Sequence, residues 1–130
     1  QDRVREVGNI SRGLKQMAKD WDCPVLALSQ LSRSCEQRAD HRPMLSDLRD
    51  SGDIEQDADT IWFLYRDEYY FPNTEKKNRA ELNIAKQRNG PTGTIDLTWM
   101  PRSTTFRSAE HFHKTEEEPP REFVQEKIGW

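Results

Sequence analysis

Apolar residues near the start of the chain recur at helical spacing and then give way to short runs typical of strands. Six of them define one face: Val7, Ile10, Leu14, Met17, Ala18 and Trp21. This spacing predicts an amphipathic helix over roughly residues 3–21. The continuous apolar run 25–28, just after Pro24, predicts a short buried strand of a parallel sheet.

The remaining pattern predicts one more buried strand and then a hairpin. The elements expected in order are a polar loop at 31–46, helical turns near 46–49 and 53–57, a buried strand at 60–65, a mobile excursion at 67–78, strands at 79–87 and 94–100, and a short final strand at 104–106. The turn Gly90-Pro91-Thr92-Gly93 between the two alternating segments makes them an antiparallel hairpin.

This order predicts an α/β fold, with parallel strands followed by an antiparallel hairpin. Few helices are available to cover such a sheet, so we expect an incomplete domain, the C-terminal portion of a larger α/β nucleotide-binding domain. We place this body at residues 1–107. Residues 108–130 are polar and acidic and contain Pro119-Pro120, which predicts a disordered tail.

Composition narrows the class of protein. The 130 residues are 33% charged with a mean hydropathy of −1.04, and the net charge of −3 argues against a protein that coats nucleic acid through general basicity. The excess acid lies beyond residue 107, so the body is neutral with local basic patches. Cys23 and Cys35 show no metal-ligand spacing, no metal site is expected, and no stretch is long and apolar enough for a membrane span. We expect a cytoplasmic protein.

The most informative stretch for function is Lys86-Gln87-Arg88-Asn89-Gly90-Pro91. Residues two apart in a strand lie on one face, so Lys86 and Arg88 should leave the sheet together as a doubly charged fork. A guanidinium beside an ammonium suits a phosphate chain. The alternative is a pair of exposed cations at a hairpin end, which is common.

Gln30 follows the predicted strand at 25–28, at the edge where open α/β sheets bind ligands. Its amide could sense a phosphate or orient a water. The alternative is a polar residue that ends a strand and satisfies the local backbone.

Four arginines, at positions 33, 38, 42 and 49, interleave with acids in the loop that follows. They fit either surface ion pairs or contacts with a nucleic-acid backbone. Residues 47–59 contain six acids, without the spacing of a calcium loop, and we expect these to cap short helices and to pair with Arg49. Gly52 would allow a backbone N–H to approach a ligand closely.

Taken together, these segments resemble the C-terminal half of the motor domain of DnaB-type replicative DNA helicases, a RecA-like family of hexameric ATPases. The resemblance runs from about Val4 to Phe106. It is carried by Ile10–Lys15, Ala27–Arg33, Glu36–Pro43, Ser46–Gly52, Ile54–Asp59 and Lys86–Pro91.

The resemblance implies a role for each matched residue. Gln30 would sense the γ-phosphate and couple the nucleotide to the DNA loops. Arg49, Asp50 and Gly52 would lie on the loop that grips single-stranded DNA; the family usually has Glu where Asp50 stands. Arg88 would be an arginine finger, with Lys86 as its companion.

The resemblance also implies ATP and Mg²⁺, held mainly by residues outside this chain, because residues 1–130 contain no phosphate loop of the GxxxxGK[ST] type. Lys86 and Arg88 then have no evident ligand within the chain, and we expect them to act on ATP bound by a neighbouring subunit. The implied partners are single-stranded DNA, further copies in a homo-hexameric ring, primase and a helicase loader.

The function expected is therefore that of part of a replicative helicase, an ATP-dependent enzyme that translocates on single-stranded DNA and separates the duplex. The isolated chain should be inactive alone. An alternative is a non-catalytic truncated or split-gene module that binds DNA or a helicase ring. A RecA-like recombination or repair ATPase fits less well, because residues 47–59 and 86–91 favour the helicase.

Overall fold

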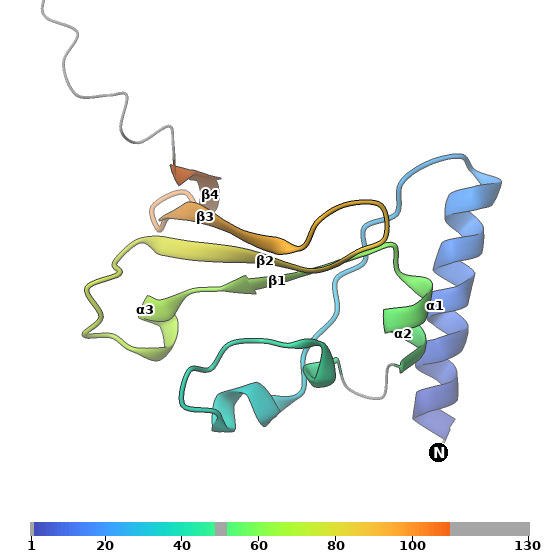
Figure 1. The fold of residues 1–130 in the computed structure, drawn as a ribbon, viewed down its shortest axis with the longest axis horizontal. Helices are drawn as coiled ribbons and strands as arrows, with labels where there is room; N and C mark the ends of the chain where they lie inside the picture. Colours follow the sequence, from blue (N-terminus) through green and yellow to red (C-terminus); the bar gives the residue numbers. More distant parts are fainter. Residues whose placement is uncertain (1, 49–51, 110–130) are drawn as a thin grey trace, which may run out of the picture.

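The computed structural model describes residues 2–48 and 52–109 (Figure 1). The elements are α1 (Asp2–Asp20), the 3₁₀ turns η1 (Arg33–Gln37) and η2 (Leu45–Asp47), α2 (Gly52–Asp57), β1 (Thr60–Tyr65), α3 (Asp67–Tyr70), β2 (Arg79–Gln87), β3 (Gly93–Met100) and β4 (Thr105–Ser108). The fold is α/β. The predicted first helix, the strand at 60–65, the hairpin and a short final strand are all confirmed.

The four strands form one sheet in chain order, and every pairing in it is antiparallel. Strands that follow each other in the chain often pair. The pairing of β2 with β3 could be predicted from the sequence because only a short turn separates them. In Figure 1 the helices α1 and α2 lie together at one end of the sheet, and α3 lies at the other end.

The core lies between the sheet and the segment 31–48, which runs beneath one face of the sheet (Figure 1). Leu48, Ile61 and Phe63 are its buried centre. Partly buried neighbours pack on them from the loop, from α2 and from β2: Leu31, Leu45, Ile54, Ala58 and Ala85. Along β1, burial alternates strictly, so Trp62 and Leu64 point to the opposite, exposed face.

The expected strand at 25–28 is wrong. This segment has no strand pairing, and Leu26 and Leu28 are 77% and 96% exposed. A parallel strand is buried when neighbouring strands hydrogen-bond to it and other elements cover its faces. None of the four strands in the described residues pairs with the segment 25–28. The parallel start of the sheet is accordingly not confirmed.

The excursion at 67–78 contains helix α3 and an aromatic stack. The His41 and Tyr70 rings lie 4.8 Å apart and nearly parallel, and the Tyr65 ring stacks on Tyr70 with the centroids 5.7 Å apart. Asp67 accepts hydrogen bonds from Tyr65 and Thr74, which ties the excursion to β1. The sequence pattern predicts 67–78 only as a mobile excursion and does not reveal these contacts; of the residues in them, only His41 comes from a distant part of the chain.

The predicted tail falls almost entirely outside the described residues, as do Arg49 and Asp50. Both cysteines are free, Cys23 exposed and Cys35 buried. Among the helices of the described ranges, none is long and apolar enough to cross a membrane.

Candidate functional site at the end of strand β2

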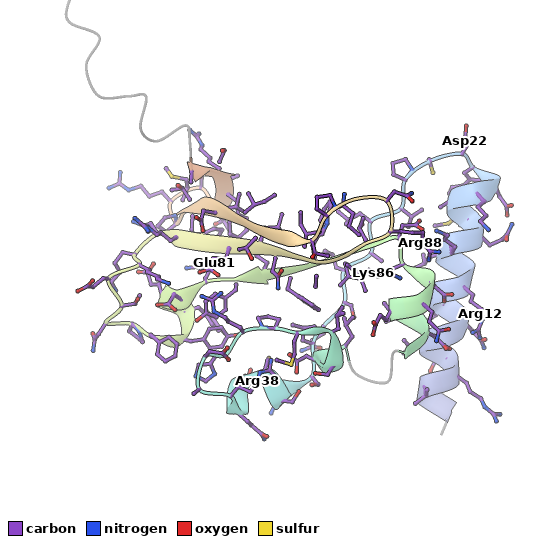
Figure 2. The ribbon with its side chains drawn as sticks, in the orientation of Figure 1. Arg12, Asp22, Arg38, Glu81, Lys86 and Arg88 are labelled. Atoms are coloured by element: carbon purple, nitrogen blue, oxygen red, sulfur yellow. The ribbon has the colours of Figure 1, made fainter. Side chains whose placement is uncertain are left out.

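Lys86 and Arg88 lie at the end of the sheet nearest α1 and α2 (Figure 2). The ammonium of Lys86 donates to the carbonyl oxygen of Glu55. The guanidinium of Arg88 donates to the carbonyl oxygen of Gln56 at 3.0 Å. The two cations therefore reach the same side of the sheet, as predicted, and bind consecutive carbonyls of one helix.

These contacts correct the expectation that the pair has no ligand within the chain. The last carbonyls of a helix have no intrahelical partner, and the C-terminal end of a helix carries partial negative charge. The last turn of α2 presents such carbonyls to both cations. Sequence periodicity does not reveal this, because α2 and β2 meet only in the folded chain.

A β-bulge aims the two cations toward α2. The register pairs Ile61 with Lys86 and Trp62 with Ile84, so Ala85 is an extra residue on β2. Directly paired residues lie on the same face of a sheet. Lys86 therefore shares the face of the buried Ile61, which packs near α2, whereas uninterrupted alternation from Ile84 would turn Lys86 to the face of Trp62.

Asp59, between α2 and β1, is the acidic partner of the site. Its carbonyl oxygen accepts the Arg88 backbone N–H at 2.8 Å, and its Oδ1 lies 3.1 Å from Arg88 Nε. Its Oδ2 accepts from the ammonium of Lys15 on α1. The hydrogen bond from Lys15, aided by the positive charges of Lys15, Arg88 and Lys86, lowers the pKa of Asp59 below its usual value.

Arg88 keeps capacity for a further anion. Its side chain is 51% exposed. Arginine has more N–H donors than the contacts with Asp59 and Gln56 use, and it forms paired hydrogen bonds to phosphate oxygens. The site can therefore present a fixed positive charge to a phosphate from outside the chain.

The other predicted site residues stand apart from this pair. Gln30 is exposed in the extended segment after Pro24, and within the described part of the chain no hydrogen bond joins it to Lys86 or Arg88. Gly52 is the exposed first residue of α2, where an added Cβ would meet nothing within 4 Å. The helix α2 thus runs from Gly52 to the carbonyls that hold Lys86 and Arg88.

Two of the loop arginines are engaged inside the protein. Arg38 forms a two-pronged pair with the buried carboxylate of Asp47, with N–O distances of 2.8 and 2.5 Å. Arg42 pairs with Glu81 and lies over the Tyr65 ring, 4.5 Å from its centroid. Their contacts favour the ion-pair interpretation over contact with a nucleic-acid backbone.

Three of the acids in residues 47–59 are ion-pair partners: Asp47, Asp53 and Asp59. Asp53 pairs with Arg12 of α1 at 3.2 Å, which helps to dock α2 on α1. The described residues contain no cluster of three side chains suited to hold a metal ion. Reasoning from sequence missed Lys15 and Asp59, because Lys15 lies 44 positions from Asp59 and the contact forms only when α1 packs on α2.

Comparisons with known proteins extend this description. The family described as DnaB-like helicase C-terminal domain matches residues 1–108. The replicative DNA helicase DnaB of Geobacillus stearothermophilus is 52% identical over 120 residues, 92% of this chain and 26% of that protein. The replicative DNA helicase DnaC of Bacillus subtilis is 56% identical over 109 residues, 84% of this chain and 24% of that protein. The chain spans about a quarter of the length of these relatives.

Solved structures agree with the sequence matches. One solved ATPase domain superposes with a TM-score of 0.80 at 54% identity, over 83% of this chain and 38% of that one. A DnaB-like replicative helicase, studied together with its interactions with primase, gives the same TM-score and identity over 83% of this chain and 26% of its own. The chain therefore belongs to the DnaB-like helicase C-terminal domain family.

Proposed function

We propose that the chain is part of the motor of a ring-shaped replicative DNA helicase, which couples ATP hydrolysis to translocation on single-stranded DNA and to duplex unwinding. Its relatives are named replicative DNA helicases, and the match covers residues 1–108. In this proposal the body completes a RecA-like domain, and the protein acts in the cytoplasm.

The role of the β2 end is to supply positive charge to ATP bound by a neighbouring subunit. Arg88 acts as an arginine finger and Lys86 as its companion, because hydrolysis builds negative charge on the transferred phosphoryl group. The observation that carries this proposal is the half-exposed Arg88, anchored at a sheet end with donors to spare. The phosphate loop and the Mg²⁺ ligands come from residues outside this chain.

The contacts that Arg88 makes within the chain still allow it to bind ATP held by a neighbouring subunit. Arg88 and Asp59 are both about half exposed, at 51% and 53%. Water screens an exposed ion pair of this kind, and the guanidinium keeps donors that a phosphate can bind beside Asp59 and Gln56.

Single-stranded DNA and further copies of the protein are the partners proposed for the remaining site residues. Arg49, Asp50 and Gly52 would bind the DNA backbone, and Gln30 would report the state of the γ-phosphate to them. The exposed extended segment that carries Gln30 gives the side chain room to reach a nucleotide. A homo-hexameric ring, primase and a helicase loader complete the proposed assembly.

The experiment uses a chimera in which residues 1–108 replace the matched segment of the Geobacillus stearothermophilus helicase. The chimera should assemble and hydrolyse ATP, and Arg88→Ala should reduce hydrolysis by about 10³-fold or more while nucleotide binding persists. Binding is followed with a fluorescent ATP analogue. An assembled chimera without ATPase activity, or an Arg88→Ala variant that hydrolyses ATP normally, contradicts the proposal.

The absence of a phosphate loop motif from residues 1–130 also favours a second function, a non-catalytic module that binds DNA or a helicase ring. This alternative expects the 130-residue chain to bind single-stranded DNA or the ring on its own. Fluorescence anisotropy with labelled oligonucleotides separates the two, because the helicase proposal needs the assembled ring for tight DNA binding.

A further inference from the structure

Arg88 is oriented by contacts from two different parts of the chain. Asp59 binds it twice, through the carbonyl that accepts the Arg88 backbone N–H and through Oδ1 at 3.1 Å from Nε. Gln56 of α2 accepts from a terminal nitrogen of the guanidinium at 3.0 Å. The backbone of Arg88 and the end of its side chain are therefore both held by contacts within the chain.

The Asp59 carboxylate is itself held by a second cation. Each of its oxygens pairs with a different cation: Oδ1 lies next to the Arg88 guanidinium, and Oδ2 accepts from the Lys15 ammonium. Lys15 belongs to α1, a long helix whose neighbours include α2 (Figure 1). The three side chains thus form a chain of contacts from α1 to the guanidinium of Arg88, and they lie at one end of the sheet.

The contacts leave one side of the guanidinium open. One terminal nitrogen donates to Gln56, and Nε lies 3.1 Å from Asp59 Oδ1 in an ion pair, while the other terminal nitrogen donates to no acceptor in residues 2–48 or 52–109. An arginine held along one edge presents its other donors in a fixed direction, and less conformational freedom is lost when a phosphate binds. A contact of this kind accelerates a reaction by orientation.

We propose that Asp59 is a positioning residue for Arg88, and that Lys15 holds Asp59 in place. This inference rests on the proposed role of Arg88 toward a neighbouring subunit's ATP. Asp59 does not touch the nucleotide; it acts through Arg88. Removal of its charge lets the guanidinium move among rotamers, which slows the step in which charge develops on the phosphate.

The test uses the assembled chimera described above. Asp59→Asn keeps the size of the side chain and removes its charge; kcat should fall about three- to tenfold with KM for ATP changed less than about twofold. Lys15→Gln should lower kcat by about twofold, since it acts one contact further away. Asp59→Glu restores a carboxylate and should recover part of the lost rate.

The matched control is Asp53→Asn. Asp53 of α2 likewise pairs with a cation of α1, Arg12, but no hydrogen bond or ion pair in the described residues joins it to Arg88. It should leave kcat unchanged while lowering the melting temperature about as much as Asp59→Asn does. Equal losses of kcat in the two variants would mean that only general docking of α1 on α2 matters, which overturns the proposal.

Two further outcomes separate this inference from the proposed function. An unchanged or raised kcat in Asp59→Asn, with Arg88→Ala still inactive, rejects positioning and leaves the finger role intact. Normal hydrolysis in Arg88→Ala rejects the finger role and the inference with it.

Discussion

Replacement of Asp47 by Asn should destabilise the fold more than any other single isosteric change in the segment 31–48. Asp47 is 1% exposed and accepts hydrogen bonds on both oxygens. Oδ1 accepts from Ser34 and from Arg38, each at 2.8 Å, and Oδ2 accepts from Arg38 at 2.5 Å and from the Met44 backbone N–H at 2.8 Å. The carboxylate thus ties η1, the loop and η2 together.

The expected loss follows from this geometry. In Asn one oxygen becomes an NH₂ group, which in either orientation faces an N–H donor of Arg38 and cannot accept from it. Hydrogen bonds to a charged group are worth about 1.5–3 kcal/mol, and breaking a buried ion pair costs about 3–5 kcal/mol. Because the Arg38 side chain is 27% exposed and regains some water, we expect a loss of about 3 kcal/mol.

The assay is urea unfolding of the 130-residue chain at pH 7, followed by tryptophan fluorescence. Asp40→Asn is the matched control, since Asp40 lies 4.0 Å from the same Arg38 but is 58% exposed. It should change the free energy of unfolding by less than about 0.5 kcal/mol. A loss in Asp47→Asn below about 1 kcal/mol, or equal to that of the control, would refute the reasoning.

The same pair predicts a pH dependence. The hydrogen bond from Arg38, helped by those from Met44 and Ser34, holds the pKa of Asp47 far below its usual range. A carboxyl group with a lowered folded-state pKa stabilises the fold above its unfolded pKa, about 4, and this stability is lost as the pH falls further. The stability gap between wild type and Asp47→Asn should therefore narrow below about pH 4; a constant gap down to about pH 2 would contradict the assignment.

The remaining predictions concern the core and the first helix. Phe63→Ala should lower the unfolding free energy by about 3–5 kcal/mol, because Phe63 is 4% exposed in the core; Leu64→Ala, on the exposed face, should cost clearly less in the same urea assay. Gly13→Ala should stabilise the chain by about 0.5–1 kcal/mol, since its added Cβ meets nothing within 4 Å in a helix. Gly8→Ala should gain less, because its Cβ would lie 2.0 Å from Asp53 Oδ2 and displace that side chain from Arg12; equal gains at the two glycines would argue against the close packing of α1 on α2.

Prediction from sequence worked where the determinants are local. The amphipathic spacing of residues 3–21 specifies α1, and the alternation on either side of Gly90–Gly93 specifies the hairpin, because partners across a tight turn are close in sequence. It failed at 25–28, where an apolar run needs partners that the described strands do not supply. The spacing of apolar residues indicates which side chains a segment could bury. Whether they are buried depends on the neighbouring elements that cover them in the folded chain.

In the candidate site, too, some features follow from the local sequence and others from tertiary packing. The sequence alone determined that Lys86 and Arg88 leave the end of a strand together beside a turn, since that follows from the two-residue period of a strand. Only the tertiary structure decided where they point. The bulge at Ala85 turns them toward α2, the carbonyls of α2 receive them, and Lys15 and Asp59 come from distant positions to hold Arg88. Contacts of this kind depend on how whole elements pack, because packing brings together charges that no spacing along the chain connects.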